Sequence, residues 1–152
     1  MTKSWTIAKR SVVLTSVEPP SPFEQLVAIM ARLRAPGGCP WDREQTHESI
    51  IPYLIEEANE AKAALAEQDW EAFKDEMGDV LCQVIFHALI AQEASRFTLD
   101  DICNAIREKL IRRHPHVFGN VKVNGVADVF KNWEEIKQKE RQEKQKRKSE
   151  KD

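Results

Sequence analysis

Apolar residues recur every three or four positions along most of this chain, which is the spacing of one face of an α-helix. The first such segment follows Ser21 and Glu24, which form a capping box with a proline in the first turn. Its apolar positions continue to Leu33, and the prolines and glycines of residues 36–40 end it. This pattern predicts a first helix between Ser21 and residue 36.

Four more helices are predicted from the same spacing. Their approximate positions are residues 49–67 with Pro52 in the first turn, residues 70–94 after an Asp69 cap, a segment capped by Thr98 and Asp101, and a segment that contains Val129, Trp133 and Ile136. Residues 114–124 contain proline and glycine and are predicted to form a loop. No stretch alternates strictly between apolar and polar residues, so we expect an all-α fold, a bundle of about five helices.

Composition narrows the class of protein. With 152 residues, 41% hydrophobic and 32% charged, the chain is typical of one soluble globular domain. A net charge of −2 gives no general attraction to nucleic acid or to anionic lipid, and no apolar run approaches the roughly 18–20 residues that span a bilayer. The three cysteines are widely spaced, which argues against a disulfide framework and favours a cytoplasmic location.

The chain divides into three parts by composition. Residues 1–20 are expected to be a flexible N-terminal extension, and residues 21–140 carry the helical pattern of the domain. Residues 141–152 are almost entirely charged or polar, without apolar partners, and are expected to be a solvated tail.

Two acidic pairs are the most informative polar feature. Glu57 and Glu60 lie three residues apart on the second predicted helix, directly after Glu56, and therefore share one helical face. Glu76 and Asp79 repeat this spacing on the third helix. The third helix continues from Asp79 into a run that is apolar on almost every side, which indicates a buried helix. Carboxylates that continue a buried face are costly unless a cation lies among them.

A divalent cation meets this requirement, and a ligand set made only of oxygen favours magnesium, with manganese as a possible substitute. Other interpretations stay open from the residues alone. The pairs can be ordinary surface glutamates, or an acidic face on which another protein docks. A di-iron centre is disfavoured because its Glu-x-x-His pairs are absent. His87, in the middle of the third helix, fits a hydrogen-bonded core residue better than a ligand.

Basic residues gather at the end of the fourth predicted helix, at Lys109, Arg112 and Arg113. Cations there complement the negative end of the helix dipole, and arginines also bind phosphate oxygens in a bidentate manner. Both interpretations are open from the residues. Trp133 has the spacing of a core residue, although the face of an indole can also stack on a base.

The pattern Glu-Glu-x-x-Glu, followed one helix later by Glu-x-x-Asp, resembles the signature of the MazG-like all-α nucleoside triphosphate pyrophosphohydrolases. Three flanking segments, residues 38–46, 109–118 and 133–137, also resemble this family. The resemblance extends over residues 23–140. Asn59 stands where many members have an aromatic residue, and a change of base preference is the expected consequence.

The resemblance implies a helical bundle completed by dimerisation, as a homodimer or a dimer of dimers, and the apolar third helix agrees with this. It implies magnesium-dependent hydrolysis of nucleoside triphosphates to monophosphate and pyrophosphate, by attack of water on the α-phosphorus, in a house-cleaning role in nucleotide metabolism. The implied metal ligands are Glu57, Glu60, Glu76 and Asp79, with Glu56 as an accompanying catalytic residue, and the implied substrate-binding residues are Lys109, Arg112, Arg113, Trp133 and Lys137. The alternative is a helical module that binds nucleotide or metal without catalysis.

Overall fold

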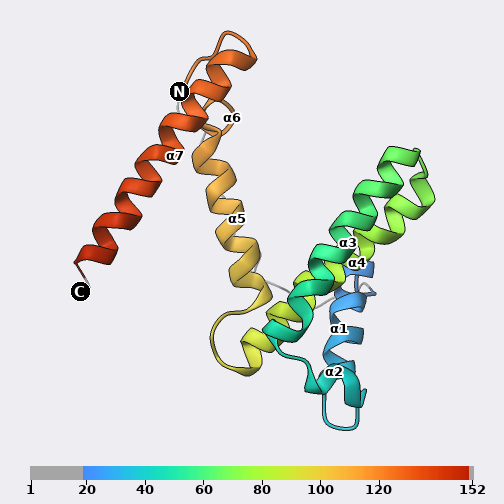
Figure 1. The fold of residues 1–152 in the computed structure, drawn as a ribbon. Helices are drawn as coiled ribbons and strands as arrows, with labels where there is room; N and C mark the ends of the chain where they lie inside the picture. The colour runs from blue at the N-terminus through green and yellow to red at the C-terminus, as the bar shows by residue number, and fades with distance from the viewer. Residues whose placement is uncertain (1–18, 151–152) are drawn as a thin grey trace. The chain divides into compact units, whose positions relative to one another are not determined.

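The computed structural model describes residues 19–150, and all the regular secondary structure in this range is helical (Figure 1). The helices are α1 (Pro22–Arg34), α2 (Pro40–Glu44), α3 (His47–Glu67), α4 (Trp70–Glu93), α5 (Leu99–Arg113), α6 (Pro115–Phe118) and α7 (Val126–Ser149). The predicted all-α class is therefore confirmed. The predicted N-terminal extension lies, up to residue 18, outside the described residues.

Helices α1 and α2 belong to a compact unit that ends at Glu44. The predicted capping box starts α1: the Ser21 amide donates to Glu24 Oε2 at 2.7 Å, and the Glu24 amide donates to Ser21 Oγ at 3.2 Å. At the joint with α2, the Cys39 amide donates to the Leu33 carbonyl oxygen at 2.8 Å. A Cβ atom at Gly38 would lie 2.2 Å from the same oxygen, so this joint requires glycine.

Helices α3 and α4 pack side by side in antiparallel directions in the second unit, which begins at Gln45 (Figure 1). Asp69 caps α4 through a hydrogen bond from the Ala72 amide, and Gln68 makes the turn with a φ of 59°. Small and branched apolar side chains fill the contact. The buried residues of the pair are Ile50, Ala61, Ala64, Ile85, Phe86, Ala88 and Ala91.

The start of α3 differs from the prediction. The helix begins at His47 rather than near Ser49, because Thr46 is the N-cap and forms a reciprocal capping box with Ser49. Pro52 is consequently the sixth residue of the helix and not part of its first turn. Proline has no amide hydrogen, so α3 forgoes the bond that residue 52 would donate to the carbonyl of Glu48.

Two short helices were not predicted, and the last helix is longer than expected. Helix α2 follows the Gly-Cys-Pro joint, and α6 lies inside the predicted loop, with Pro115 at its first position. Helix α7 continues to Ser149 through most of the predicted tail, because lysine, arginine, glutamate and glutamine are good helix formers. Its last turns are exposed, as expected for a solvated segment. No helix in residues 19–150 combines the length and the apolar character that crossing a bilayer requires.

Candidate active site

Three carboxylates from two helices converge on one point. Glu57 on α3 and Glu76 and Asp79 on α4 each place one oxygen so that all three oxygens lie within 4.8 Å of one another. The spacing of three residues puts Glu76 and Asp79 on one face of α4, and the pairing of α3 with α4 brings Glu57 to that face. The structure thus unites residues of both acidic pairs.

Burial and repulsion between negative charges determine the electrostatics of this acidic cluster. Partial burial, followed by the charges of Asp79 and Glu60, raises the pKa of Glu57 above its ordinary value. Partial burial, followed by the charges of Glu60 and Asp79, also raises the pKa of Glu76. The neighbouring carboxylates therefore make the ionisation of Glu57 and Glu76 less favourable. A small divalent cation with oxygen ligands fits this arrangement, because it would convert the mutual repulsion into attraction.

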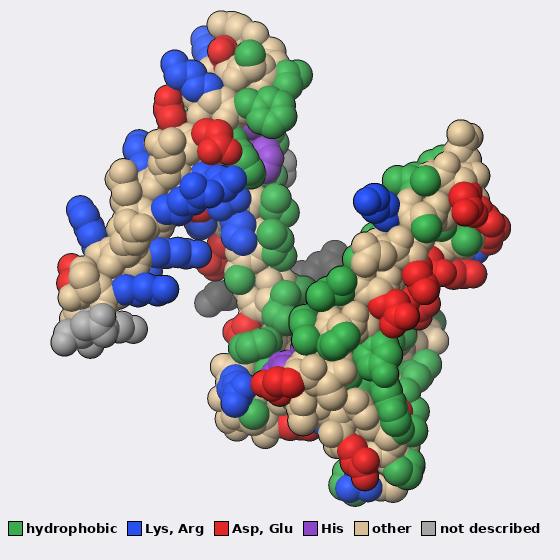
Figure 2. All heavy atoms as spheres, in the orientation of Figure 1, with side chains coloured by type: hydrophobic (Ala, Val, Ile, Leu, Met, Phe, Trp, Pro, Cys, Tyr) green, Lys and Arg blue, Asp and Glu red, His purple; other side chains and the backbone are tan. Residues whose placement is uncertain are grey.

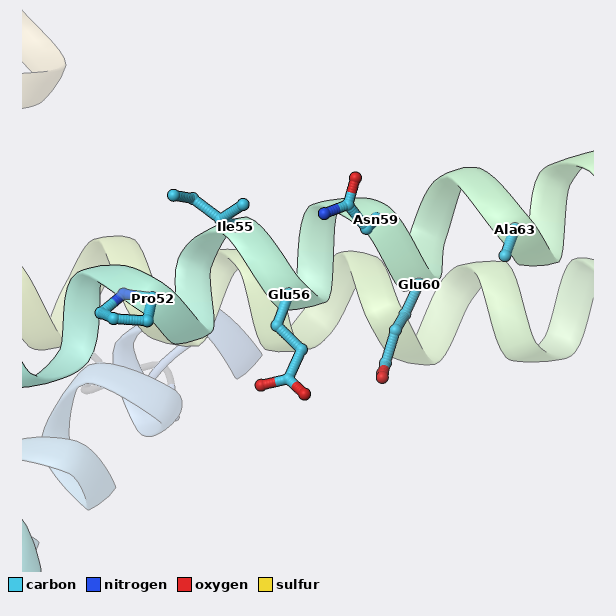
Figure 3. A pocket seen from close by; sticks show the side chains of 6 residues that line it. All are labelled: Pro52, Ile55, Glu56, Asn59, Glu60 and Ala63. Atoms are coloured by element: carbon cyan, nitrogen blue, oxygen red, sulfur yellow. The ribbon is translucent and has the colours of Figure 1, made fainter.

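Glu56 and Glu60 lie beside the acidic cluster on an exposed face of α3. They line an open pocket of about 530 Å³ together with Pro52, Ile55, Asn59 and Ala63 (Figure 3). The side chains of Glu56 and Glu60 point to the same side of the helix, one turn apart (Figure 3). Glu60 is close enough to Glu57 and Glu76 to raise the pKa of both. Of the four predicted ligands, it is the one outside the group of converging oxygens.

The predicted basic residues form a second cluster, between α5 and α7. Arg113 donates to Glu140 through Nε at 3.2 Å and Nη2 at 2.6 Å, and Arg112 donates through Nε at 2.7 Å. These two arginines hold the pKa of Glu140 at about 2, against an ordinary value of 4.5. Hydrogen bonding to Glu140 in turn raises the pKa of Arg113. The ion pair of Glu140 and Arg113 therefore stays charged at neutral pH.

Trp133 lies in the same basic cluster. The Arg113 guanidinium is 5.4 Å from the centre of the Trp133 rings, and Lys137 Nζ is 4.4 Å from it, both within the range of cation–π attraction. Lys109 is half-buried one turn before Arg113 on α5. The structure therefore brings Arg112, Arg113, Trp133 and Lys137 together around Glu140, a residue that the sequence analysis did not select. No pattern in the sequence indicates Glu140, since it is one of many glutamates in α7.

Charge of each sign gathers on different helices. Figure 2 shows acidic side chains over the α3–α4 pair and basic side chains along α7. The acidic cluster and the basic cluster therefore lie on different helices of this chain.

The structure also pairs two histidines. The rings of His47 and His87 are stacked, with 5.1 Å between their centres, and their Nδ1 atoms lie 2.8 Å apart. Burial, followed by the charge of His47, lowers the pKa of His87. The prediction that His87 is a hydrogen-bonded residue of the bundle is confirmed for Nδ1, while its buried Nε2 has no partner among the described residues. His47 lies 40 positions from His87 in the sequence, and no sequence pattern indicated that the two would pair.

The chain is similar to several known proteins. Residues 45–118 match the family model of the MazG nucleotide pyrophosphohydrolase domain, a range that includes the acidic cluster and the arginines of α5. A nucleoside triphosphate pyrophosphohydrolase/pyrophosphatase MazG from Thermotoga maritima is 53% identical over 119 residues, which are 78% of this chain and 45% of that protein. A nucleoside triphosphate pyrophosphohydrolase from Escherichia coli is 48% identical over 123 residues, 80% of this chain and 47% of that protein.

A solved structure is similar as well. The crystal structure of a mazG-related protein from Thermotoga maritima aligns with a TM-score of 0.64 and 27% sequence identity, over 76% of this chain and 98% of the other. The chain spans about half the length of the two curated relatives. Through the domain at residues 45–118, the chain belongs to the MazG nucleotide pyrophosphohydrolase family.

Proposed function

We propose that this protein hydrolyses nucleoside triphosphates to nucleoside monophosphate and pyrophosphate, with Mg²⁺ as the cofactor. The observation that carries the proposal is the convergence of Glu57, Glu76 and Asp79 within 4.8 Å on a domain of the MazG family. The names of the relatives support the reaction type, since the T. maritima and E. coli proteins are named nucleoside triphosphate pyrophosphohydrolases.

The acidic cluster would hold the metal, and Glu60 would complete the ligand set by a change of side-chain rotamer. When bound, the ion supplies Lewis-acid polarisation of the phosphate oxygens. Mn²⁺ has the same preference for oxygen ligands and is expected to substitute. Phosphoryl transfer to water requires little covalent chemistry from a protein, so the role of these residues would be to hold the ion and to position the reactants.

Glu56 is the residue that we assign to the attacking water. Its carboxylate is exposed next to Glu60 and accepts a hydrogen bond from the water, which orients the lone pair toward the α-phosphorus. A bond forms between the water oxygen and the α-phosphorus, and the bond from this phosphorus to the bridging oxygen breaks. Pyrophosphate leaves with the bridging oxygen, and the water loses one proton, for which we assign Glu56 as the acceptor.

The basic cluster of α5 and α7 would bind the substrate. Lys109, Arg112 and Arg113 neutralise the triphosphate, and Arg113 offers a planar guanidinium that matches two phosphate oxygens. Trp133 provides an aromatic face for the base, and Lys137 beside it adds positive charge. According to the resemblance, many relatives have an aromatic residue at the position of Asn59. We therefore expect Asn59, in the pocket of α3, to change which base is preferred.

We further propose that two copies of the chain form a homodimer, or a dimer of dimers, through the α3–α4 pair. Ile55, Met77 and Leu81 expose 60%, 48% and 38% of their surface, which is unfavourable for large apolar side chains on neighbouring helices. The pocket of Figure 3 is lined only by residues of α3, so it lacks an opposite wall, and a second copy would supply one. Light scattering at micromolar concentration tests this; the mass of a monomer would contradict it.

We propose the cytoplasm as the location. Cys39, Cys82 and Cys103 are widely spaced in the sequence and form no paired motif, which argues against a disulfide framework and is usual for a reducing compartment. Neither a membrane nor a nucleic acid is proposed as a partner.

The proposed reaction is tested by measuring the release of pyrophosphate and monophosphate from a panel of ribo- and deoxyribonucleoside triphosphates, with and without magnesium. We expect magnesium-dependent release by the wild type that is lost in Glu60→Gln and Asp79→Asn. Glu67→Gln, which removes an exposed charge two turns beyond Glu60 on the same helix, should retain activity. A wild type that binds nucleotide and releases no product would instead indicate the non-catalytic binding module.

A further inference from the structure

Glu140 links α7 to the end of α5 through both arginines of the basic cluster. Its side chain is only 14% exposed, and that of Arg113 only 18%, whereas Arg112 is 52% exposed. The contact between Glu140 and Arg113 is therefore the shielded part of the cluster. An ion pair that is shielded from water and held by two N–H groups fixes side-chain positions more firmly than an exposed pair does.

The geometry leaves part of the Arg113 guanidinium available. Glu140 accepts from Nε and Nη2, which together form one edge of the planar group. A guanidinium has five N–H groups, so both hydrogens of Nη1 and one of Nη2 remain. These form the second edge, which is suited to a bidentate contact with phosphate. Glu140 and a phosphate can therefore bind Arg113 at the same time, without competing for the same hydrogens.

The same contact determines where Arg113 lies relative to Trp133. The guanidinium carbon is 5.4 Å from the centre of the indole rings, close enough for cation–π attraction. Arginine has several freely rotating bonds, and without Glu140 its guanidinium would sample many positions away from the tryptophan. Glu140 thus fixes the relative position of a phosphate-binding group and of an aromatic face.

We propose that Glu140 is a positioning residue for substrate: it orients Arg113, beside Trp133, to bind a phosphate group of the nucleoside triphosphate. The proposal rests on the function proposed above and adds a residue outside the matched range 45–118. With its pKa at about 2, Glu140 remains charged at any pH used for an assay, so this role does not depend on pH near neutrality.

The test compares Glu140→Gln and Glu140→Asp with the wild-type chain. Glu143→Gln is the matched control, because it removes an exposed glutamate from α7 that forms no ion pair in the part of the chain that the structure describes. For each protein, KM and kcat are measured with the best substrate of the nucleotide panel. The Kd is measured by equilibrium dialysis with α,β-methylene analogues of the ribonucleoside triphosphates, which cannot be cleaved between the α- and β-phosphorus. Circular dichroism checks that each variant is folded.

If Glu140 positions Arg113, Glu140→Gln raises KM and Kd about tenfold, the equivalent of ~1.4 kcal/mol, and changes kcat by less than about twofold. Glu140→Asp, which keeps the charge on a shorter side chain, restores part of the affinity. In an Arg113→Ala background, Glu140→Gln has no further effect on Kd, because both changes remove the same oriented group. If Glu140→Gln does not fold, the comparison of Glu140→Asp with the wild type carries the test, with a smaller rise in KM and Kd expected.

Other outcomes overturn the proposal in distinguishable ways. An unchanged KM and Kd with a lowered melting temperature would assign Glu140 a structural role only. A lowered KM and Kd would mean that Glu140 competes with phosphate for Arg113. A wild type that binds nucleotide without turnover would refute the proposed hydrolysis, while the ratio of Kd values still tests Glu140. A wild type that binds no nucleoside triphosphate refutes both.

Discussion

Replacing Asp79 with asparagine separates the two effects that the acidic cluster should have on stability. Without metal, Asp79 repels Glu57 and Glu76, and this repulsion opposes folding. With magnesium, the same carboxylate attracts the ion. We therefore expect Asp79→Asn to stabilise the metal-free protein slightly and to remove its stabilisation by magnesium.

The size of the metal-free effect follows from the geometry. Oxygens of Glu57 and Asp79 lie within 4.8 Å, a separation at which two unit charges in water repel by about 0.9 kcal/mol. Physiological salt, with a screening length of about 8 Å, reduces this to roughly 0.5 kcal/mol for the pair of Glu57 and Asp79. For a chain of this length, this pair alone corresponds to a rise in melting temperature of about 1–2 °C, and the loss of the repulsion between Asp79 and Glu76 adds to the rise.

The effect of magnesium is larger. An ion that binds only the folded state stabilises it by about 1.4 kcal/mol when its concentration is ten times its Kd. The wild-type melting temperature should then rise by roughly 3–6 °C between chelator and magnesium. Differential scanning fluorimetry at one fixed protein concentration, over a series of magnesium concentrations, measures both effects. Calcium in place of magnesium serves to test the selectivity of the site.

The control is Glu67→Gln, which removes a charge of the same sign from α3 outside the acidic cluster and should keep the full response to magnesium. The reasoning is refuted if Asp79→Asn responds to magnesium as the wild type does. It is also refuted if the variant lowers the melting temperature of the chelated protein, because Asp79 would then make a favourable contact rather than a repulsive one.

Two further predictions concern the scaffold. The lowered pKa of His87 means that the folded state binds fewer protons than the unfolded state below the ordinary value of 6.5, so the free energy of unfolding should fall as the pH drops below that value. Urea titrations at a series of pH values from about 5 to about 7.5, the range in which histidines titrate, should show this dependence of the unfolding free energy on pH. His87→Gln should reduce the dependence; if the wild type and the variant show the same dependence, other groups cause it. Thr98→Ala should lower the free energy of unfolding by about 1 kcal/mol because it removes the cap of α5, whereas Thr98→Ser should be close to neutral. If urea unfolding shows the same loss of stability for both variants, the capping role is contradicted.

Local structure was largely predictable from sequence because its causes are local. Ser21 and Thr98 cap their helices through residues three positions away, and those contacts require no knowledge of the fold. The prediction was less good where two local signals compete. At the start of α3, Ser49 and Thr46 both suit a cap, and Pro52 favoured the later start; the observed cap at Thr46 adds a turn and satisfies more amides.

The acidic cluster was predictable only in part. The spacing on each helix placed Glu76 with Asp79 and Glu57 with Glu60, since residues three apart share a face. Which member of the α3 pair turns toward α4 depends on the rotation of one helix against the other. Packing of Ile50, Ala61 and Ile85 determines that rotation, and it selects Glu57 over Glu60.

By itself, then, the sequence determined the all-α class, the caps of α1, α4 and α5, and the two acidic pairs, because these depend on residues within one or two helical turns. Only the tertiary structure decided which three carboxylates converge, that Glu140 binds Arg113 across 27 positions, and that His47 meets His87 across 40. Such contacts depend on how helices far apart in sequence pack together. That packing follows from the summed burial of many apolar side chains, and no short pattern of residues encodes it.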